Sequence, residues 1–132
     1  MWNEGSKIKS VSRIQIEIEV KNKGIMRAEL IRHSSPLTIS SITRNLPISG
    51  RIHNNSNTFY YIQTQLSIGA EKQKTCFDKG EIAYMTTNNA ICFFVKKIAT
   101  IPMNKIGRIK DNIKILEQVE PKDIMEIKID RK

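Results

Sequence analysis

The chain has 132 residues, and its 22 Lys and Arg against 13 Asp and Glu give a formal net charge of +9. This length fits one domain with one core, and no stretch approaches the ~20 apolar residues that a membrane-spanning helix needs. The first residues are polar and lack the apolar core of an export signal, so we expect a cytoplasmic protein. We expect a flexible segment at residues 1–10 and a single domain at residues 11–132.

The chain begins its ordered part with a predicted β-hairpin. Residues 13–20 alternate β-branched and polar side chains with a period of two, which is typical of a half-buried strand. Asn and Gly at residues 21–24 favour a turn, because both tolerate positive φ. Residues 25–32 then form a second strand, antiparallel to the first.

Two short helices are predicted farther along the chain. Ser35 can cap free N–H groups and Pro36 fits the first helical position, so a helix is expected over residues 35–46. Asp111 can cap a second helix at residues 112–120, where apolar side chains follow a three-residue step.

The rest of the chain is predicted to be mainly strand. We expect a polar loop at residues 67–74 and a connection at residues 96–103 that holds Pro102. Further strands are expected at residues 50–52, 58–66, 81–85, 90–95, 105–110 and 124–129, and residues 75–77 are left open as a short strand. About eight largely antiparallel strands with two short helices favour a small β-barrel, because closure removes exposed sheet edges.

The residues with metal-binding side chains do not form a recognisable site. His33, His53, Cys76 and Cys92 lack the paired local spacing of a zinc motif, so we expect no metal and no cofactor. The two cysteines are expected to be reduced, partly buried thiols, and sequence does not settle whether they pair.

Several local strings point to a known family. Residues 80–84 read Gly-Glu-Ile-Ala-Tyr, and residues 90–94, after a turn, read Ala-Ile-Cys-Phe-Phe. Other features fit the same family and follow its order along the chain. They are Leu46-Pro47, Tyr60, Pro102 and the Ile-Gly-Arg-Ile string at residues 106–109. Together they resemble the cyclophilin-like domain family of small archaeal and bacterial proteins, mostly uncharacterised and distant fold relatives of the peptidyl-prolyl isomerases. The resemblance begins near Ile25, so the first hairpin strand looks like an addition to the family's fold.

The isomerase site itself does not carry over as a motif. Isomerases of this fold have a Phe-His-Arg string on one strand and a Phe-x-x-Gln string on the next. This chain has Arg51 and His53 without Phe-His-Arg, and residues 59–63 place aromatics and a Gln at different spacing. Residues 55–58 read Asn-Ser-Asn-Thr where family members often have Trp-Gly and acidic residues, and Val95 replaces a usual Gly.

The central segment offers the best candidate site. No acidic residue lies between Glu29 and Glu71, so the surface that this segment forms is expected to be electropositive. Such a surface on a small barrel suits an anionic small molecule or a peptide, because ligand pockets combine apolar walls with a few placed donors. We therefore predict a non-catalytic ligand- or peptide-binding module. The candidate binding residues are Arg51, His53, Asn54, Asn55, Tyr61, Gln63 and Phe94.

Two other functions stay open. A weak peptidyl-prolyl isomerase would use Arg51 as the donor to the proline nitrogen, with Tyr61, Gln63 and Phe94 as pocket walls. A nucleic-acid-binding protein would use the basic surface and the aromatics at residues 59–61. We favour the nucleic-acid alternative less, because the basic residues are dispersed along the chain. The natural ligand and the oligomeric state are left open.

Overall fold

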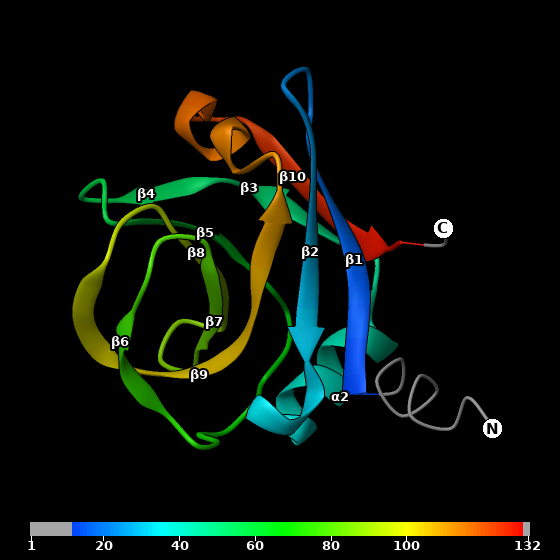
Figure 1. Ribbon diagram of the computed structural model, residues 1–132, viewed down its shortest axis with the longest axis vertical. Coiled ribbons are helices and arrows are strands. Elements are labelled where there is room, and N and C mark those ends of the chain that lie inside the picture. Colours follow the sequence, from blue (N-terminus) through cyan, green and yellow to red (C-terminus); the bar gives the residue numbers. More distant parts are fainter. Residues whose placement is uncertain (1–11, 131–132) are drawn as a thin grey trace, which may run out of the picture.

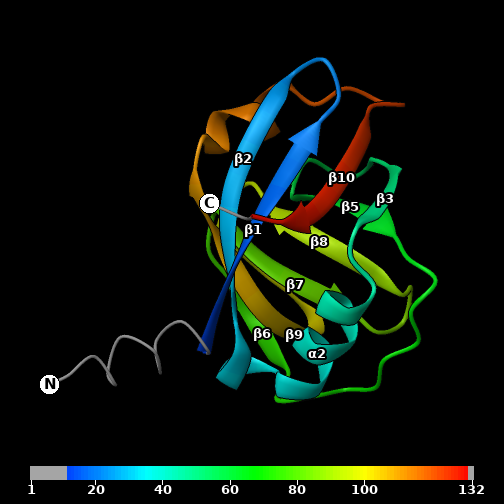
Figure 2. The ribbon, with the colours of Figure 1, turned by 90° about the vertical axis from the view of Figure 1, so that its right-hand side faces the viewer.

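The protein is described by a computed structural model that covers residues 12–130, so the predicted flexible segment at residues 1–10 lies outside the described residues. A mostly β, antiparallel fold is confirmed, with ten strands rather than about eight (Figures 1 and 2). The strands are β1 (Arg13–Val20), β2 (Gly24–Ile31), β3 (Ile48–Arg51), β4 (His53–Asn55), β5 (Phe59–Gln63), β6 (Lys74–Phe77), β7 (Glu81–Met85), β8 (Ala90–Phe94), β9 (Ile98–Asp111) and β10 (Ile124–Ile129). They follow the spatial order β3-β10-β1-β2-β9-β7-β8-β5-β4, and β6 pairs with β9 off this path.

The helical segments are shorter than predicted. They are η1 (Arg32–Ser34), α2 (Pro36–Arg44) and η2 (Ile113–Gln118), of which η1 and η2 are 3₁₀ helices. Asp111 is the last residue of β9 and does not cap η2, because Asn112 turns the chain with a left-handed φ of 63°. Ser35 does not cap α2 with its side chain either; its hydroxyl donates to the Lys105 carbonyl oxygen over 2.8 Å.

β9 is longer than the sequence suggested. Residues 98–103 of the predicted connection and the predicted strand at residues 105–110 belong to one curved strand, the gold ribbon that sweeps through Figure 1. The first part of β9 pairs with β6, and its later part pairs with β7 and β2. Pro102 is tolerated because the β6 ladder is irregular between Lys74 and Cys76, opposite the proline.

Two hydrophobic cores lie on opposite faces of the same strands. In β7, Ile82 and Tyr84 belong to the larger core inside the curved sheet, whereas Ala83 belongs to a second core under β6 and the start of β9. β8 divides in the same way, with Phe93 in the first core and Phe94 in the second. Burial on both faces explains why residues 90–94 are all buried and form an uninterrupted apolar run.

The sheet curves without closing into a barrel. Its path of ladders ends at β3 on one side and at β4 on the other, and no ladder among residues 12–130 joins these two strands. The two ends are nevertheless consecutive in the chain, separated by Ile52 alone. The prediction of a β-barrel is therefore corrected to an open, curved antiparallel sheet, whose two end strands flank Ile52.

A buried polar cluster fixes α2 to β9. The carboxylate of Glu71 accepts the backbone N–H groups of Leu37 at 2.9 Å and Thr38 at 2.8 Å, and also the Thr38 hydroxyl at 2.7 Å. The fully buried Asn104 accepts the Glu71 N–H and donates to both the Thr38 hydroxyl and the Gly69 carbonyl. A carboxylate from a distant loop therefore caps the helix that Ser35 was expected to cap.

We predict that Glu71→Gln lowers the free energy of unfolding by about 1 kcal/mol at pH 7, the usual scale of a lost helix cap. Burial acts to raise the pKa of Glu71, but the donors of Leu37 and Thr38 outweigh it and hold the pKa below 4.5. The stabilisation from this charge is therefore present above about pH 4.5 and is lost as the pH falls through the folded-state pKa.

Urea unfolding of both proteins at pH 7 and pH 3 measures this effect. The difference between wild type and Glu71→Gln should shrink at pH 3. Glu117→Gln is the control, because Glu117 is 56% exposed and pairs with Lys79 at the surface. An equal difference at the two pH values would contradict the capping role of the Glu71 charge.

Candidate functional site

The candidate site lies where one strand segment changes partners. β3 pairs with β10, with Arg51 opposite Ile124, whereas β4 pairs with β5, with His53 opposite Tyr61. Between them, the N–H of Ile52 donates to the Asp123 carbonyl oxygen over 2.9 Å. Beyond this bond the chain before β10 leaves the strand, so β4 has a described neighbour on its β5 side alone.

A tight turn forms the opposite wall. Within the turn, the N–H of Asp123 donates to the Glu120 carbonyl oxygen over 3.1 Å, and the N–H of Glu120 donates to the Asp123 carboxylate over 2.8 Å. Lys122 has a φ of 80°, and Pro121 precedes it, as in a turn whose third residue is left-handed. The turn therefore has hydrogen bonds of its own, in addition to the bond from Ile52.

The space between strand and turn is a cavity of about 330 Å³, which we call the notch. It combines apolar and polar side chains from segments about 60 residues apart in the sequence. The notch is lined by Arg51, Ile52, His53, Asn54, Tyr60, Val119, Glu120, Pro121 and Lys122.

The charges around the notch are unequal. The cations of Arg51 and Lys122 line it, against the single carboxylate of Glu120. That carboxylate is engaged elsewhere, because the ammonium group of Lys23 lies 2.7 Å from Glu120 and 3.4 Å from Asp123. The hydrogen bond to Glu120 is the main reason why the pKa of Lys23 is raised above 10.5. The segment without acidic residues therefore lies beside the carboxylates of Glu120 and Asp123, which Lys23 already neutralises.

Three of the seven predicted binding residues line the notch. They are Arg51, His53 and Asn54, all exposed. His53 also stacks on Tyr61, with ring centroids 5.1 Å apart and an interplanar angle of 24°. The amide of Asn54 bonds the side chain and the backbone N–H of Asn57, so Asn54 also shapes the β4–β5 turn.

The other four predicted residues lie outside the notch lining. Asn55 accepts two hydrogen bonds from Thr58 in the β4–β5 turn. Gln63 is exposed and donates to Asn88 over 3.0 Å. Phe94 is fully buried in the second core, stacked on Phe77 at 4.7 Å and tilted against Phe59 at 5.2 Å.

The residues that sequence reasoning missed come mainly from residues 119–122. Nothing in the local pattern of Val119, Pro121 or Lys122 indicates that they face Arg51, because the contact is set by the pairing of β10 with β3. Tyr60 packs against the larger core and also lines the notch.

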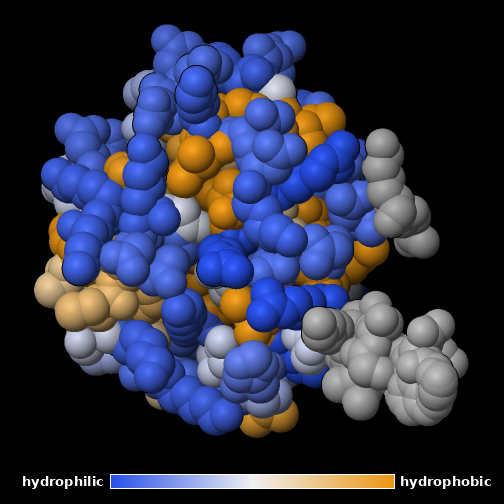
Figure 3. Space-filling view, viewed as in Figure 1, coloured by the Kyte–Doolittle hydropathy of each residue, from blue (hydrophilic) through white to orange (hydrophobic). Residues whose placement is uncertain are grey.

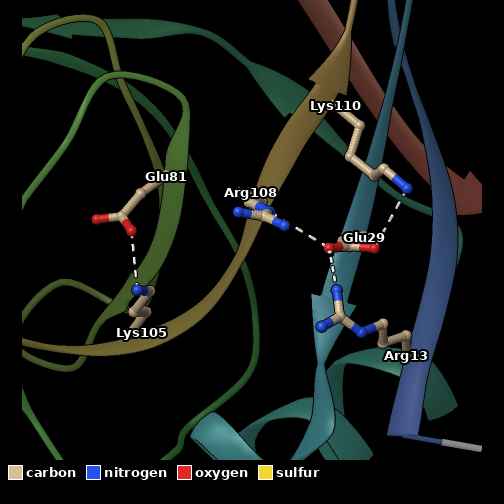
Figure 4. A network of polar contacts seen from close by, with 6 residues as sticks. All are labelled: Arg13, Glu29, Glu81, Lys105, Arg108 and Lys110. Carbon is tan, nitrogen blue, oxygen red and sulfur yellow. Dashed lines mark hydrogen bonds and ion pairs between the residues drawn. The ribbon is translucent and has the colours of Figure 1, made fainter. Parts of the chain in front are cut away.

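A second charged cluster surrounds Glu29, whose side chain is 1% exposed (Figure 4). Its carboxylate lies 2.7 Å from Arg13, 3.3 Å from Arg108 and 3.5 Å from Lys110, which reach it from β1 and β9. Burial acts to raise the pKa of Glu29, but the charges of Lys110 and Arg13 outweigh it, and the pKa is lowered. These three cations share the Glu29 carboxylate as their partner. The cations of the notch differ, because the one carboxylate that lines it is paired with Lys23.

Comparisons with known proteins identify the family. A family model described as Cyclophilin-like matches residues 12–128. The chain belongs to the cyclophilin-like family. The match includes β1, so the expectation that the first hairpin strand is an addition to the family fold is wrong. No curated protein matches the chain.

Two solved structures share the cyclophilin-like fold with this chain. The solution structure of the hypothetical protein AF2241 from Archaeoglobus fulgidus matches with a TM-score of 0.76 and 22% identity, over 90% of this chain and 96% of that one. The structure of McbB in complex with tryptophan matches with a TM-score of 0.74 and 14% identity, over 89% of this chain and 45% of that one. At these identities the likeness establishes the fold alone.

We predict that Phe94 acts in folding rather than in binding. Phe94→Ala should lower the free energy of unfolding by about 3–5 kcal/mol, the usual cost of removing a buried phenyl ring. Gln63→Ala, at an exposed position on a neighbouring strand, should cost less than about 1 kcal/mol. Urea unfolding of the two variants tests the contrast, and a Phe94→Ala protein as stable as Gln63→Ala would refute it.

Proposed function

We propose that this cyclophilin-like domain is a non-catalytic binding module whose notch takes a small anionic ligand, a carboxylate or phosphate with an apolar portion. The observation that carries the proposal is the unequal charge of the notch. The cations of Arg51 and Lys122 face a cavity whose one lining carboxylate, on Glu120, is held by Lys23. Cations beside a cavity favour a ligand that brings the missing negative charge.

The lining of the notch also suits an apolar group. Ile52, Tyr60, Val119 and Pro121 provide hydrophobic surface beside the cations. Ligand pockets combine apolar walls with a small number of placed polar groups, and their volumes begin near 300 Å³. A volume of about 330 Å³ therefore favours a ligand of the size of a single amino acid or a short peptide end.

Tryptophan is a useful first probe for this proposal. It is the compound named in the structure of McbB, a protein that shares the fold at 14% identity. It joins a carboxylate to a large apolar ring, which is the combination of groups that the notch favours. Its α-ammonium group adds a positive charge, so N-acetyl-tryptophan is the better match to the cations.

The isomerase and nucleic-acid alternatives receive less support. An isomerase pocket built on Arg51 would need walls from Phe94, but that ring is buried in the second core. Continuous phosphate binding would need unpaired cations along one face, but many basic side chains on β1, β2, β9 and β10 lie in ion pairs. These are Arg13, Arg27, Arg108, Lys110 and Lys128. The face seen in Figure 3 is largely hydrophilic, with hydrophobic side chains between the polar ones rather than one broad apolar area.

We predict that N-acetyl-tryptophan and phenyl phosphate raise the melting temperature of the wild type at millimolar concentration, because a ligand that binds the native state stabilises it. Arg51→Gln should weaken binding of each probe at least about tenfold, the scale of one lost charged hydrogen bond. Isothermal titration calorimetry gives the dissociation constants.

The matched control is Lys97→Gln, which removes an exposed cation outside the notch and should leave binding within about twofold. Binding should also weaken as salt rises, because the cations of the notch are exposed. If no carboxylate or phosphate stabilises the wild type at 10 mM, the proposed function is wrong. Proline-peptide isomerisation that disappears in Arg51→Ala would favour the enzyme instead.

A further inference from the structure

The notch lies along the edge of a strand rather than on its face. Four consecutive residues, Arg51 to Asn54, line the same cavity. Side chains of a strand alternate between the two faces, so a cavity lined by consecutive residues must lie beside the backbone edge. That edge belongs to β4, which ends the path of ladders on this side of the sheet (Figure 1).

The notch occupies the place where a continued β10 would lie. β10 follows the strand edge as far as the pairing of Ile124 with Arg51 and the Ile52 bond to Asp123. The turn at residues 120–123 then carries the chain away, while the strand edge continues through β4. An exposed edge of this kind is a template for an added strand, because its backbone groups have no ladder partner.

We propose that the notch binds the C-terminal end of an extended peptide, which adds to the free edge of β4 as an antiparallel strand; this rests on the proposed function. The peptide runs in the direction of β10 and ends where β10 begins. Its terminal carboxylate then lies beside Arg51 and Lys122, and its backbone bonds the β4 edge. Strand addition and capture of a terminal carboxylate are both known modes of peptide recognition.

The geometry favours a chain end over an internal segment. The turn at residues 120–123 lies against the strand at Ile52 through the Asp123 carbonyl, and Pro121 and Lys122 line the notch, so a chain that continued past Ile52 along this edge would meet the turn. Lys23 holds both carboxylates of this turn and also bonds the Gln118 carbonyl over 2.9 Å. The wall is therefore formed before the peptide arrives, which reduces the entropy lost on binding.

The test compares peptides that differ in one group at a time. The probes are acetyl-Ala-Ala-Val-Val and acetyl-Ala-Ala-Val-Phe with free carboxylates, their C-terminal amides, and acetyl-valine and acetyl-phenylalanine as ligands without a strand. Calorimetry should show that the better tetrapeptide acid binds at least tenfold tighter than its amide and at least tenfold tighter than its one-residue counterpart.

Backbone methylation tests the strand itself. Only alternate residues of an added strand direct their N–H groups toward its partner. Methylating the amide nitrogens of the better tetrapeptide one at a time should therefore weaken binding at least tenfold at alternate positions and less than threefold at the others. Arg51→Gln should weaken the acid but not the amide, and Lys97→Gln should change neither.

Each result supports or overturns the inference. If the one-residue acids bind as tightly as the tetrapeptides and methylation has no effect at any position, the peptide inference is wrong while the anion site stands. If no tetrapeptide binds at 1 mM but N-acetyl-tryptophan does, the same conclusion follows. If no anionic probe binds, both proposals fail. Amide chemical-shift changes by NMR confined to residues 51–54 and 119–122 support the placement, and changes centred elsewhere overturn it.

Discussion

The fold depends on one strand segment that serves two neighbours. Residues 48–55 pair with β10 along β3 and with β5 along β4, so the two ends of the sheet are held one residue apart by the chain itself. This covalent link keeps the sheet curved around its larger core although the ladders do not close. The exchange of partners at Ile52 is also what leaves the β4 edge uncovered. Curvature of the sheet and the notch therefore have the same cause.

The sheet is also constrained where β9 pairs with its neighbour β2. A Cβ atom at Gly107 would collide with the backbone carbonyl of Glu29, so only glycine permits the two strands to approach this closely. Farther along the same ladder the register shifts, between Arg27 and Ala28. The same approach brings Arg108 of β9 within reach of the buried Glu29 carboxylate. Backbone packing and the charged cluster are thus parts of one arrangement.

The sequence predicts elements whose signal is local. Period-two alternation predicted β1, and the apolar runs on either side of a turn predicted β7 and β8. The predicted bounds of β7, residues 81–85, are those of the structure. Proline suggested a break in β9, but the strand tolerates Pro102 opposite an irregular ladder that no local pattern reveals. Asp111 was predicted to cap the second helix, but Asn112, in a left-handed conformation, occupies the cap position instead.

The candidate site could be predicted only in part, because some of its contacts are set by strand pairing and not by a local sequence pattern. Arg51, His53 and Asn54, which line the notch, belong to a long acid-free segment that the sequence shows directly. The burial of Phe94 could not be predicted, because sequence does not show that β8 is covered on both faces, by the larger core and by β6 with β9. Lys122 and Pro121 were missed because their contact with the segment is created by β10 pairing.

The net charge of +9 does not by itself locate an anion site; the pairing of charges does. At Glu29, three cations converge on one buried carboxylate, and this pairing weakens their attraction for an external anion. At the notch the balance is reversed, because one lysine, Lys23, engages the carboxylates of both Glu120 and Asp123. Cations such as Arg51 and Lys122 then face a cavity whose local acids are already neutralised. The availability of charge, rather than its amount, is what makes the notch the stronger candidate for an anionic partner.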